Sequence, residues 1–234
     1  MASAHLDSLR GGLIVSCQAE EGTPLGTPGV LAALAAAAER GGAVGIRANG
    51  PANLAAICAA VRVPVIGIYK VVQPPSEVYI TPTFAAARAV REAGDPPPAI
   101  IAFDATPRPR PEGETMPTLL RRIQTELGAL AMADIATFEE GVAAAEAGAD
   151  LVATTLSGYT PYTAEKRATG DPDLELVRRL AAAVSVPVIC EGRVHSPEQA
   201  RAALDAGAFA VVVGTAITAI DWVTGHYIAA MRAG

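Results

Sequence analysis

The chain has 234 residues, about half of them apolar, and a formal net charge of −6. Such a composition can bury a large core and argues against disorder. The negative charge gives no electrostatic reason to expect a nucleic acid or an anionic membrane as a partner. The length suits one α/β barrel, and no linker divides the sequence, so one domain over residues 1–234 is predicted.

Signals for export are missing from the sequence. The segment 1–12 lacks a charged stretch followed by an apolar one, so no signal peptide is expected. No window offers about 18 uninterrupted apolar residues for a membrane span. The three cysteines, Cys17, Cys58 and Cys190, are odd in number and lack paired spacing, which disfavours a disulfide framework. A reducing, cytoplasmic location is therefore expected.

Eight short apolar runs recur along the chain, each closed by a polar residue, and Ala-rich helical stretches follow most of them. Eight strand–helix units predict an α/β fold, a (β/α)8 TIM barrel. The runs are Leu13–Gln18, Val44–Arg47, Val65–Lys70, Ile100–Asp104, Ala129–Asp134, Leu151–Thr155, Val186–Glu191 and Ala210–Thr215. Strands are expected near 13–17, 43–47, 64–69, 99–103, 129–133, 150–154, 186–190 and 209–213, and helices near 28–40, 52–61, 83–93, 116–126, 137–147, 172–184, 196–206 and 219–232.

The polar ends of these runs are candidate site residues, because the C-terminal ends of barrel strands line the active site in this fold. For Gln18 and Arg47, a structural hydrogen bond at the barrel rim explains the residue equally well. The candidates are Gln18, Arg47, Lys70, Asp104, Asp134, Thr155, Glu191 and Thr215.

Lys70 and Glu191 are the strongest candidates for proton transfer. The chain has sixteen arginines but only two lysines, so a lysine at a strand end suggests a need for an amine. An ion-paired lysine or a phosphate contact is the alternative for Lys70, and a salt bridge with Arg193 is the alternative for Glu191. Burial lowers a lysine pKa and a nearby glutamate raises it, and the sequence does not decide between them.

Two glycine-containing turns end the seventh and eighth strands, Glu191–Arg193 and Val213–Ala216. Barrel enzymes often bind phosphate there through backbone N–H groups, although ordinary turns read the same way. Asp104 and Asp134 lack a nearby histidine or third acid, so hydrogen bonds to sugar hydroxyls are favoured over a metal. The three histidines show no metal-binding spacing, and His195 is expected as a solvated loop residue near the mouth.

Three further segments bear on the site or on assembly. The loops 106–114 and 156–171 are long, and long loops on this face usually cover a site. Segment 220–230 carries Trp222 and Tyr227, and its apolar face is expected to pack on its own barrel or on a partner.

Several strings resemble the bacterial N-acetylmannosamine-6-phosphate 2-epimerase family. The similarity keeps one order from Gly11 to Thr218, and the TTLSGYT and DATPRPRP strings are the most specific. The matching segments are Gly12–Gln18, Asp104–Pro111, Thr154–Thr160, Glu191–Arg193 with Ser196–Ala200, and Val213–Thr218.

The resemblance implies interconversion of N-acetylmannosamine 6-phosphate and N-acetylglucosamine 6-phosphate in sialic acid and amino-sugar catabolism. It implies no metal, no nucleotide cofactor, and a homodimer. It assigns catalysis to Lys70 and Glu191, and we also predict a substrate contact at Thr154. Substrate contacts carry over to Gln18, Arg47, Asp104 and Asp134, and phosphate contacts to Gly192, Arg193, Gly214 and Thr215.

The chain departs from the family pattern at Val71 and Ala219, where arginine is usual, and at Val194, where an aromatic residue is usual. The first two changes remove positive charge near the expected mouth. We hypothesise that Lys70 transfers the C2 proton of the ring-opened sugar, while Glu191 assists ring opening or serves the other face. The alternatives are a Schiff-base aldolase acting through Lys70 and a non-catalytic phosphosugar-binding barrel.

Overall fold

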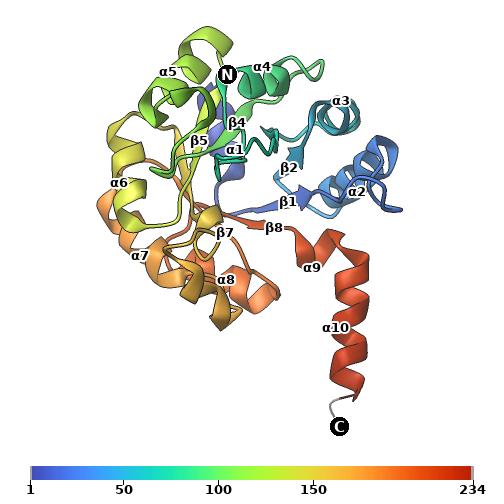
Figure 1. Ribbon diagram of the computed structural model, residues 1–234. Helices are drawn as coiled ribbons and strands as arrows, with labels where there is room; N and C mark the ends of the chain where they lie inside the picture. Colours follow the sequence, from blue (N-terminus) through green and yellow to red (C-terminus); the bar gives the residue numbers. More distant parts are fainter. Residues whose placement is uncertain (1, 233–234) are drawn as a thin grey trace.

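The computed structural model describes residues 2–232 and contains a closed barrel of eight parallel strands (Figure 1). Each strand pairs with its sequence neighbours, and β1 pairs with β8 to close the barrel. The predicted (β/α)8 fold is confirmed. The strands are β1 (Leu13–Cys17), β2 (Gly45–Asn49), β3 (Val65–Ile68), β4 (Ile100–Asp104), β5 (Leu130–Asp134), β6 (Leu151–Ala153), β7 (Val188–Glu191) and β8 (Ala210–Val213).

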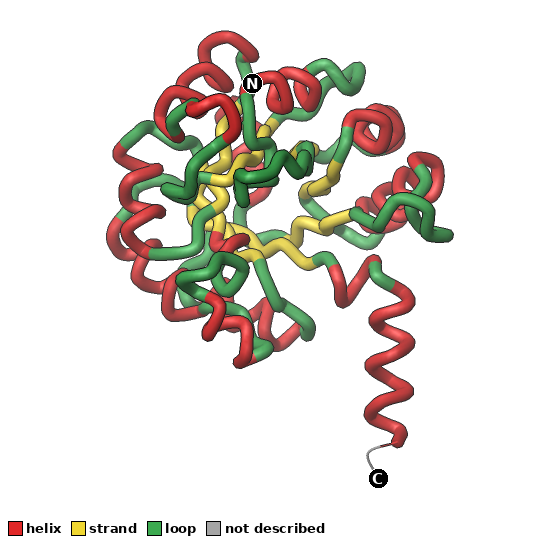
Figure 2. The backbone as a smooth tube through the Cα atoms, in the orientation of Figure 1, coloured by secondary structure: helices red, strands yellow, loops and turns green. Residues whose placement is uncertain are grey.

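Seven helices connect successive strands of the barrel, and Figure 2 shows helices lying outside the strands. Their limits lie within two residues of those expected from the sequence. Threonine or serine side chains cap four of them, which satisfies backbone N–H groups at their first turns. The seven are α2 (Pro28–Arg40), α3 (Pro51–Ala60), α4 (Phe84–Arg91), α5 (Met116–Leu127), α6 (Phe138–Glu146), α7 (Leu174–Ala183) and α8 (Pro197–Asp205).

The strands bury side chains on both faces, as their continuous apolar runs require. Ile14, Ile66 and Ile100 belong to a cluster that fills the barrel interior, whereas Val15 and Ile101 belong to the layer between strands and helices. Side chains alternate along a strand, so residues two positions beyond an interior residue also point inward. The side chains that point inward at the C-terminal mouth can therefore be identified by counting along each strand.

An N-terminal helix that the sequence reading did not predict, α1 (Ala2–Leu9), closes the opposite end of the barrel. Leu9 is fully buried and joins the interior cluster, and Leu6 packs against it. A Cβ at Gly45 would lie 2.8 Å from Cδ2 of Leu9, so the glycine lets the leucine approach β2. The helix therefore acts as an apolar plug.

The helix expected at 219–232 is present, and a short helix that was not predicted precedes it. Helix α9 (Thr215–Thr218) stays at the barrel, and α10 (Ile220–Arg232) extends away from it (Figure 1). No residue of α10 is buried. Of the two packing partners left open by the sequence, its own barrel is therefore excluded along most of the helix. Within residues 2–232, no helix is long and apolar enough to cross a membrane.

Candidate active site

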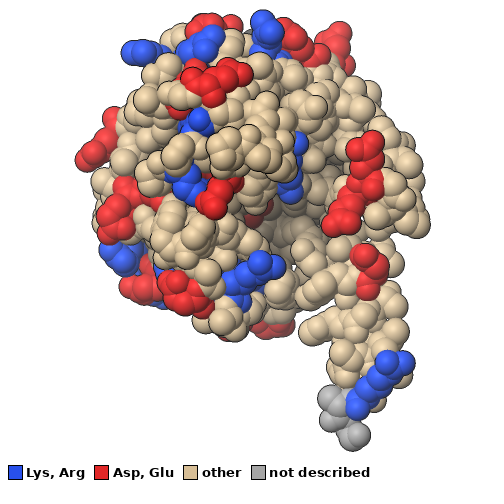
Figure 3. All heavy atoms as spheres, viewed as in Figure 1, with Lys and Arg blue, Asp and Glu red and all other residues tan. Residues whose placement is uncertain are grey.

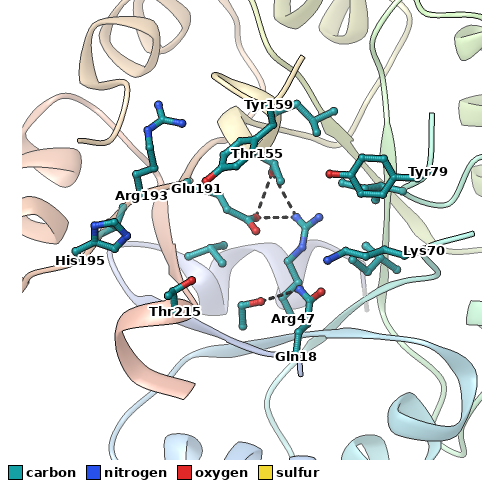
Figure 4. A pocket seen from close by; sticks show the side chains of 18 residues that line it. Gln18, Arg47, Lys70, Tyr79, Thr155, Tyr159, Glu191, Arg193, His195 and Thr215 are labelled. Carbon is teal, nitrogen blue, oxygen red and sulfur yellow. Dashed lines mark hydrogen bonds and ion pairs between the residues drawn. The ribbon is translucent and has the colours of Figure 1, made fainter. Parts of the chain in front are cut away.

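A cavity of about 240 Å³ opens at the C-terminal end of the barrel (Figure 4). Nine of the residues predicted from the strand ends and turns line it. These are Gln18, Arg47, Lys70, Thr155, Glu191, Gly192, Arg193, Gly214 and Thr215.

The two-residue period of the strands explains how these side chains meet. Ile68 and Ile189 fill the barrel interior, so Lys70 and Glu191, two residues further along, point inward one layer higher. Arg47 points inward as well, because its neighbours Ile46 and Ala48 belong to the outer layer. The charged layer is thus the continuation of the apolar core.

Arg47 stands at the centre of a buried charged cluster. Its guanidinium grips Asp134 with both terminal nitrogens, at 3.0 Å from Nη1 to Oδ1 and 2.5 Å from Nη2 to Oδ2. Nη1 also donates to Oε2 of Glu191 at 2.7 Å. Arg47 and Asp134 are both almost completely buried. One cation therefore pairs with two carboxylates at the floor of the cavity.

The Glu191 carboxyl has a perturbed acidity. Burial raises its pKa to about 6, and Asp134 raises it too, while Arg47, a hydrogen bond from Thr155 and Lys70 oppose that rise. Glu191 makes no salt bridge with Arg193, so the structural alternative considered for it does not hold. A carboxyl with this pKa changes its protonation close to neutral pH, as an acid–base group must.

Lys70 follows β3 and reaches into the cavity across from Glu191 (Figure 4). Its backbone N–H donates to Oδ1 of Asn49 at 2.8 Å, which fixes the chain where the strand ends. Desolvation and the positive charge of Arg47 lower its pKa, and Glu191 and Asp134 oppose this. Desolvation and Arg47 together therefore outweigh the two carboxylates, and the amine gives up its proton more readily than a free lysine does.

Gln18 presents an unfilled acceptor to the cavity. Its Nε2 donates to Oγ of Ser16 at 2.8 Å, which orients the amide. Its Oε1 is buried and has no hydrogen-bond partner among the described residues. A buried acceptor without a partner is costly, so a ligand N–H or O–H donor is favoured at this point.

Three residues predicted to contact a ligand do not line the cavity. Asp104 is buried and occupied by its own loop, through Oγ1 of Thr106 at 2.6 Å and Nη2 of Arg108 at 2.6 Å. Asp134 is held below Arg47. Thr154 uses its hydroxyl on the backbone of Glu191. Local donors and acceptors already engage the three side chains, so here they lie behind the wall, and their contact with a ligand stays a prediction.

Arg193 lines the cavity but is engaged with the loop after β6. Its Nε donates to the backbone carbonyl of Asp171 at 2.8 Å, and its Nη1 donates to that of Ser157. The loop residue Tyr159 lies at the mouth, with the Arg193 and Arg167 guanidinium carbons 5.6 and 5.2 Å from its ring centre. Arg193 therefore fixes the covering loop as well as the cavity wall.

The sequence reading missed Ser16, Tyr79 and Tyr159 in the cavity wall. The strand period could have found Ser16, which lies two residues beyond the interior residue Ile14. Tyr79 comes from the loop after β3, where no periodic signal exists. Burial and the carboxylates of Asp104 and Asp134 raise its pKa, so its phenol is a neutral donor.

His195 also lines the cavity mouth and is exposed, as expected of a loop residue there. Its ring centre lies 4.9 Å from that of Trp222 on α10, and Trp222 stacks on His226 at 5.2 Å. Burial and the charges of His226 and Arg193 lower the pKa of His195. The first turn of α10 is thereby attached to the rim.

The protein is a parallel (β/α)8 barrel in which an amine and a carboxyl face one cavity at the C-terminal mouth. This arrangement is typical of barrel enzymes that act by proton transfer. A family model described as "Putative N-acetylmannosamine-6-phosphate epimerase" matches residues 31–233. The chain belongs to this epimerase family.

Relatives across nearly the full length agree. A Thermosynechococcus vestitus protein named "Putative N-acetylmannosamine-6-phosphate 2-epimerase" is 50% identical over 96% of this chain and 95% of its own. The solved N-acetylmannosamine-6-phosphate 2-epimerase from Clostridium perfringens is 43% identical, has a TM-score of 0.90, and is covered over 94% of its length by 95% of this chain. A solved aldolase, QR15, is 16% identical with a TM-score of 0.62, a likeness in fold alone.

Proposed function

We propose that this chain interconverts N-acetylmannosamine 6-phosphate and N-acetylglucosamine 6-phosphate by proton transfer at C2. The observation that carries the proposal is the pairing of Lys70 and Glu191 across one cavity, with pKa values displaced toward neutrality from opposite sides. Membership in the epimerase family supports the choice of substrate.

The chemistry needs an open sugar, because the C2 proton is acidic only beside a C1 aldehyde. In the proposed reaction Glu191 assists ring opening, and the Lys70 amine takes the C2 proton to leave an enediolate-type anion. After the C1–C2 unit rotates, the Lys70 ammonium returns a proton to the opposite face of C2, which completes the inversion and restores the neutral amine. The lowered Lys70 pKa favours the neutral amine that the first transfer requires.

The substrate's remaining groups have candidate partners. Gly192 and Gly214 line the mouth, where a glycine lets an anion approach the backbone, and Arg193 and Thr215 line it beside them, so we propose this place for the phosphate. Gln18 Oε1 would accept from the acetamido N–H or a hydroxyl. Val71 and Ala219, which replace the usual arginines, lie outside the cavity wall. Asp104, Asp134 and Thr154 lie behind the cavity wall, where Asp134 binds Arg47 and Thr154 binds the backbone of Glu191.

The deciding experiment is a proton NMR time course in D2O with N-acetylmannosamine 6-phosphate. Epimerisation gives N-acetylglucosamine 6-phosphate signals with deuterium at C2. Bound substrate with neither product nor exchange would contradict the proposal and favour a phosphosugar-binding barrel. Borohydride trapping of substrate on Lys70 would instead favour an aldolase.

We also propose that the protein works in the cytoplasm as a homodimer joined through α10. The helix has thirteen residues and no buried side chain, and an isolated helix of that length is marginal in water. Tyr227 and Met231 are 68% and 82% exposed. Figure 3 shows much of its visible surface without charge. A second copy offers the same apolar helix and closes a symmetric pair.

A further inference from the structure

Two consecutive threonines at the end of β6 hold the same residue, Glu191. The β6–β7 ladder pairs Val152 with Val188 and Ala153 with Ile189. Beyond it, Oγ1 of Thr154 accepts from the Glu191 N–H at 3.1 Å and donates to the Glu191 carbonyl at 3.0 Å. A side chain thus replaces the next rung of the ladder and fixes the Glu191 backbone.

The next residue, Thr155, acts on the carboxyl group. Its Oγ1 lies 2.6 Å from Oδ1 of Asp134. It also lies 3.2 Å from Oε2 of Glu191 (Figure 4). A hydroxyl has one proton and two lone pairs, so it donates to one carboxylate at a time and can accept from the other when that one is protonated. Thr155 therefore bridges the two acids.

The bridge holds the Glu191 carboxyl by one oxygen only. Arg47 Nη1 and Thr155 Oγ1 both contact Oε2. The hydrogen bonds that described residues make with this carboxyl all involve Oε2 and none involves Oε1, and Glu191 lines the cavity. Two anchors on Oε2 fix the plane of the carboxyl and leave Oε1 for a ligand.

We propose that Thr155 is a positioning residue for the proposed epimerisation, and that its hydroxyl, with Arg47, holds Glu191 by Oε2 and turns Oε1 toward the substrate. This inference rests on the proposed function. It accounts for a threonine at a strand end that neither touches Lys70 nor serves as a helix cap. Removing the hydroxyl frees the carboxyl to rotate and leaves Asp134 without one of its donors.

The charged groups around the Glu191 carboxyl define the expected pH effect. Arg47 on β2, Lys70 after β3 and Asp134 on β5 face it from the other strands. The hydrogen bond from Thr155 lowers the Glu191 pKa, against the rise caused by burial. Without the hydroxyl the Glu191 pKa rises further above about 6, while the three charged neighbours stay in place.

The test compares Thr155→Val, which keeps the shape, with Thr155→Ser, which restores the hydroxyl. Thr125→Val on the exposed face of α5 is the matched control. We expect Thr155→Val to lower kcat roughly tenfold or more with KM changed less than about threefold, because a hydrogen bond to a charged group is lost. Its pH profile of kcat/KM should shift to higher pH, and Thr155→Ser should restore both. An unshifted profile, or a serine variant as impaired as the valine variant, would overturn the inference.

A second measurement does not depend on activity. In protein labelled with 13C at glutamate Cδ, the Glu191 signal is assigned by its loss in Glu191→Gln and titrated by NMR in wild type, Thr155→Ser and Thr155→Val. An upward shift of the Glu191 midpoint in the valine variant alone supports the bridge, and equal midpoints refute it. Where Thr155→Val does not fold, Thr155→Ala takes its place. An inactive wild type with the expected titrations would remove the proposed reaction but leave the bridge standing.

Discussion

The two ends of the barrel solve the same packing problem in opposite ways. At the N-terminal end, α1 inserts Leu9 against Gly45, and the inward positions are apolar. At the C-terminal end, the same inward positions carry Arg47 and Glu191. Strand geometry is common to both ends, so the side chains alone decide which end is core and which is site.

The comparison separates the energetic roles of the two ends. Leu9 stabilises the fold through removal of apolar surface from water. The Arg47–Asp134–Glu191 cluster pays desolvation for three charges, and such buried ion pairs are weak evidence for stability. What the cluster does provide is a carboxyl with a pKa near neutrality beside an amine with a lowered pKa. The mouth of the barrel therefore contains buried charges in place of apolar packing, and these charges perturb the pKa values of Glu191 and Lys70.

Among the variants proposed here, Lys70→Ala should have the largest effect on activity. Removal of the amine should lower kcat at least about a hundredfold, because a general acid–base group contributes on that scale or more, while the thermal midpoint changes little. Steady-state kinetics and circular dichroism measure the two quantities. Lys166→Ala, the other lysine, which pairs with Asp173 in the loop after β6, is the control and should keep its activity. A Lys70→Ala variant with wild-type turnover would remove the amine from the mechanism.

The pH dependence tests Glu191 next. Arg47 donates to its carboxylate, so we expect the ionised form to be the active one. Glu191 is protonated below its pKa of about 6, hence kcat/KM should rise with pH through about 6 and flatten above it. Glu191→Gln should be slow and lack this limb. A limb that falls through the same pH would make Glu191 the acid instead, and a limb retained in the glutamine variant would belong to another group.

How far the sequence predicts this division depends on the period of the strands. Lys70 and Glu191 were found because a strand end fixes direction and barrel topology brings the ends together. The donors that engage Asp104 come from the following loop, and no sequence period predicts the fold of that loop. Tyr79 escaped for the same reason. In both cases the local sequence pattern predicts the position of a side chain in its strand or loop. The contacts of that side chain depend on the tertiary fold, which the pattern does not give.

For the N-terminal plug we expect the opposite result to Lys70→Ala, a loss of stability with little change in turnover. Leu9→Ala removes a fully buried side chain and should lower the free energy of unfolding by about 2–5 kcal/mol. Turnover per folded molecule should stay within about twofold, because the cavity lies at the other end of the barrel. Denaturant unfolding and kinetics at low temperature measure the two. Exposed Val72→Ala, outside α10, is the aliphatic control for stability. A large loss of turnover in folded Leu9→Ala would show that the ends are coupled.

Substitutions in the outer half of α10, outside the barrel, should have the smallest effect on catalysis. Its outer half, with Tyr227 and Met231, touches neither the plug nor the cavity, whereas its first turn contacts His195 at the mouth. Tyr227→Glu with Met231→Glu places like charges on the proposed symmetric contact and should convert a dimer into a monomer by sedimentation velocity. Thr125→Glu on α5 adds charge without this effect. Activity should remain close to wild type if the first turn keeps its place, since charge is added far from Lys70 and Glu191. A wild-type chain that sediments as a monomer would instead mean that this helix meets a different partner or none.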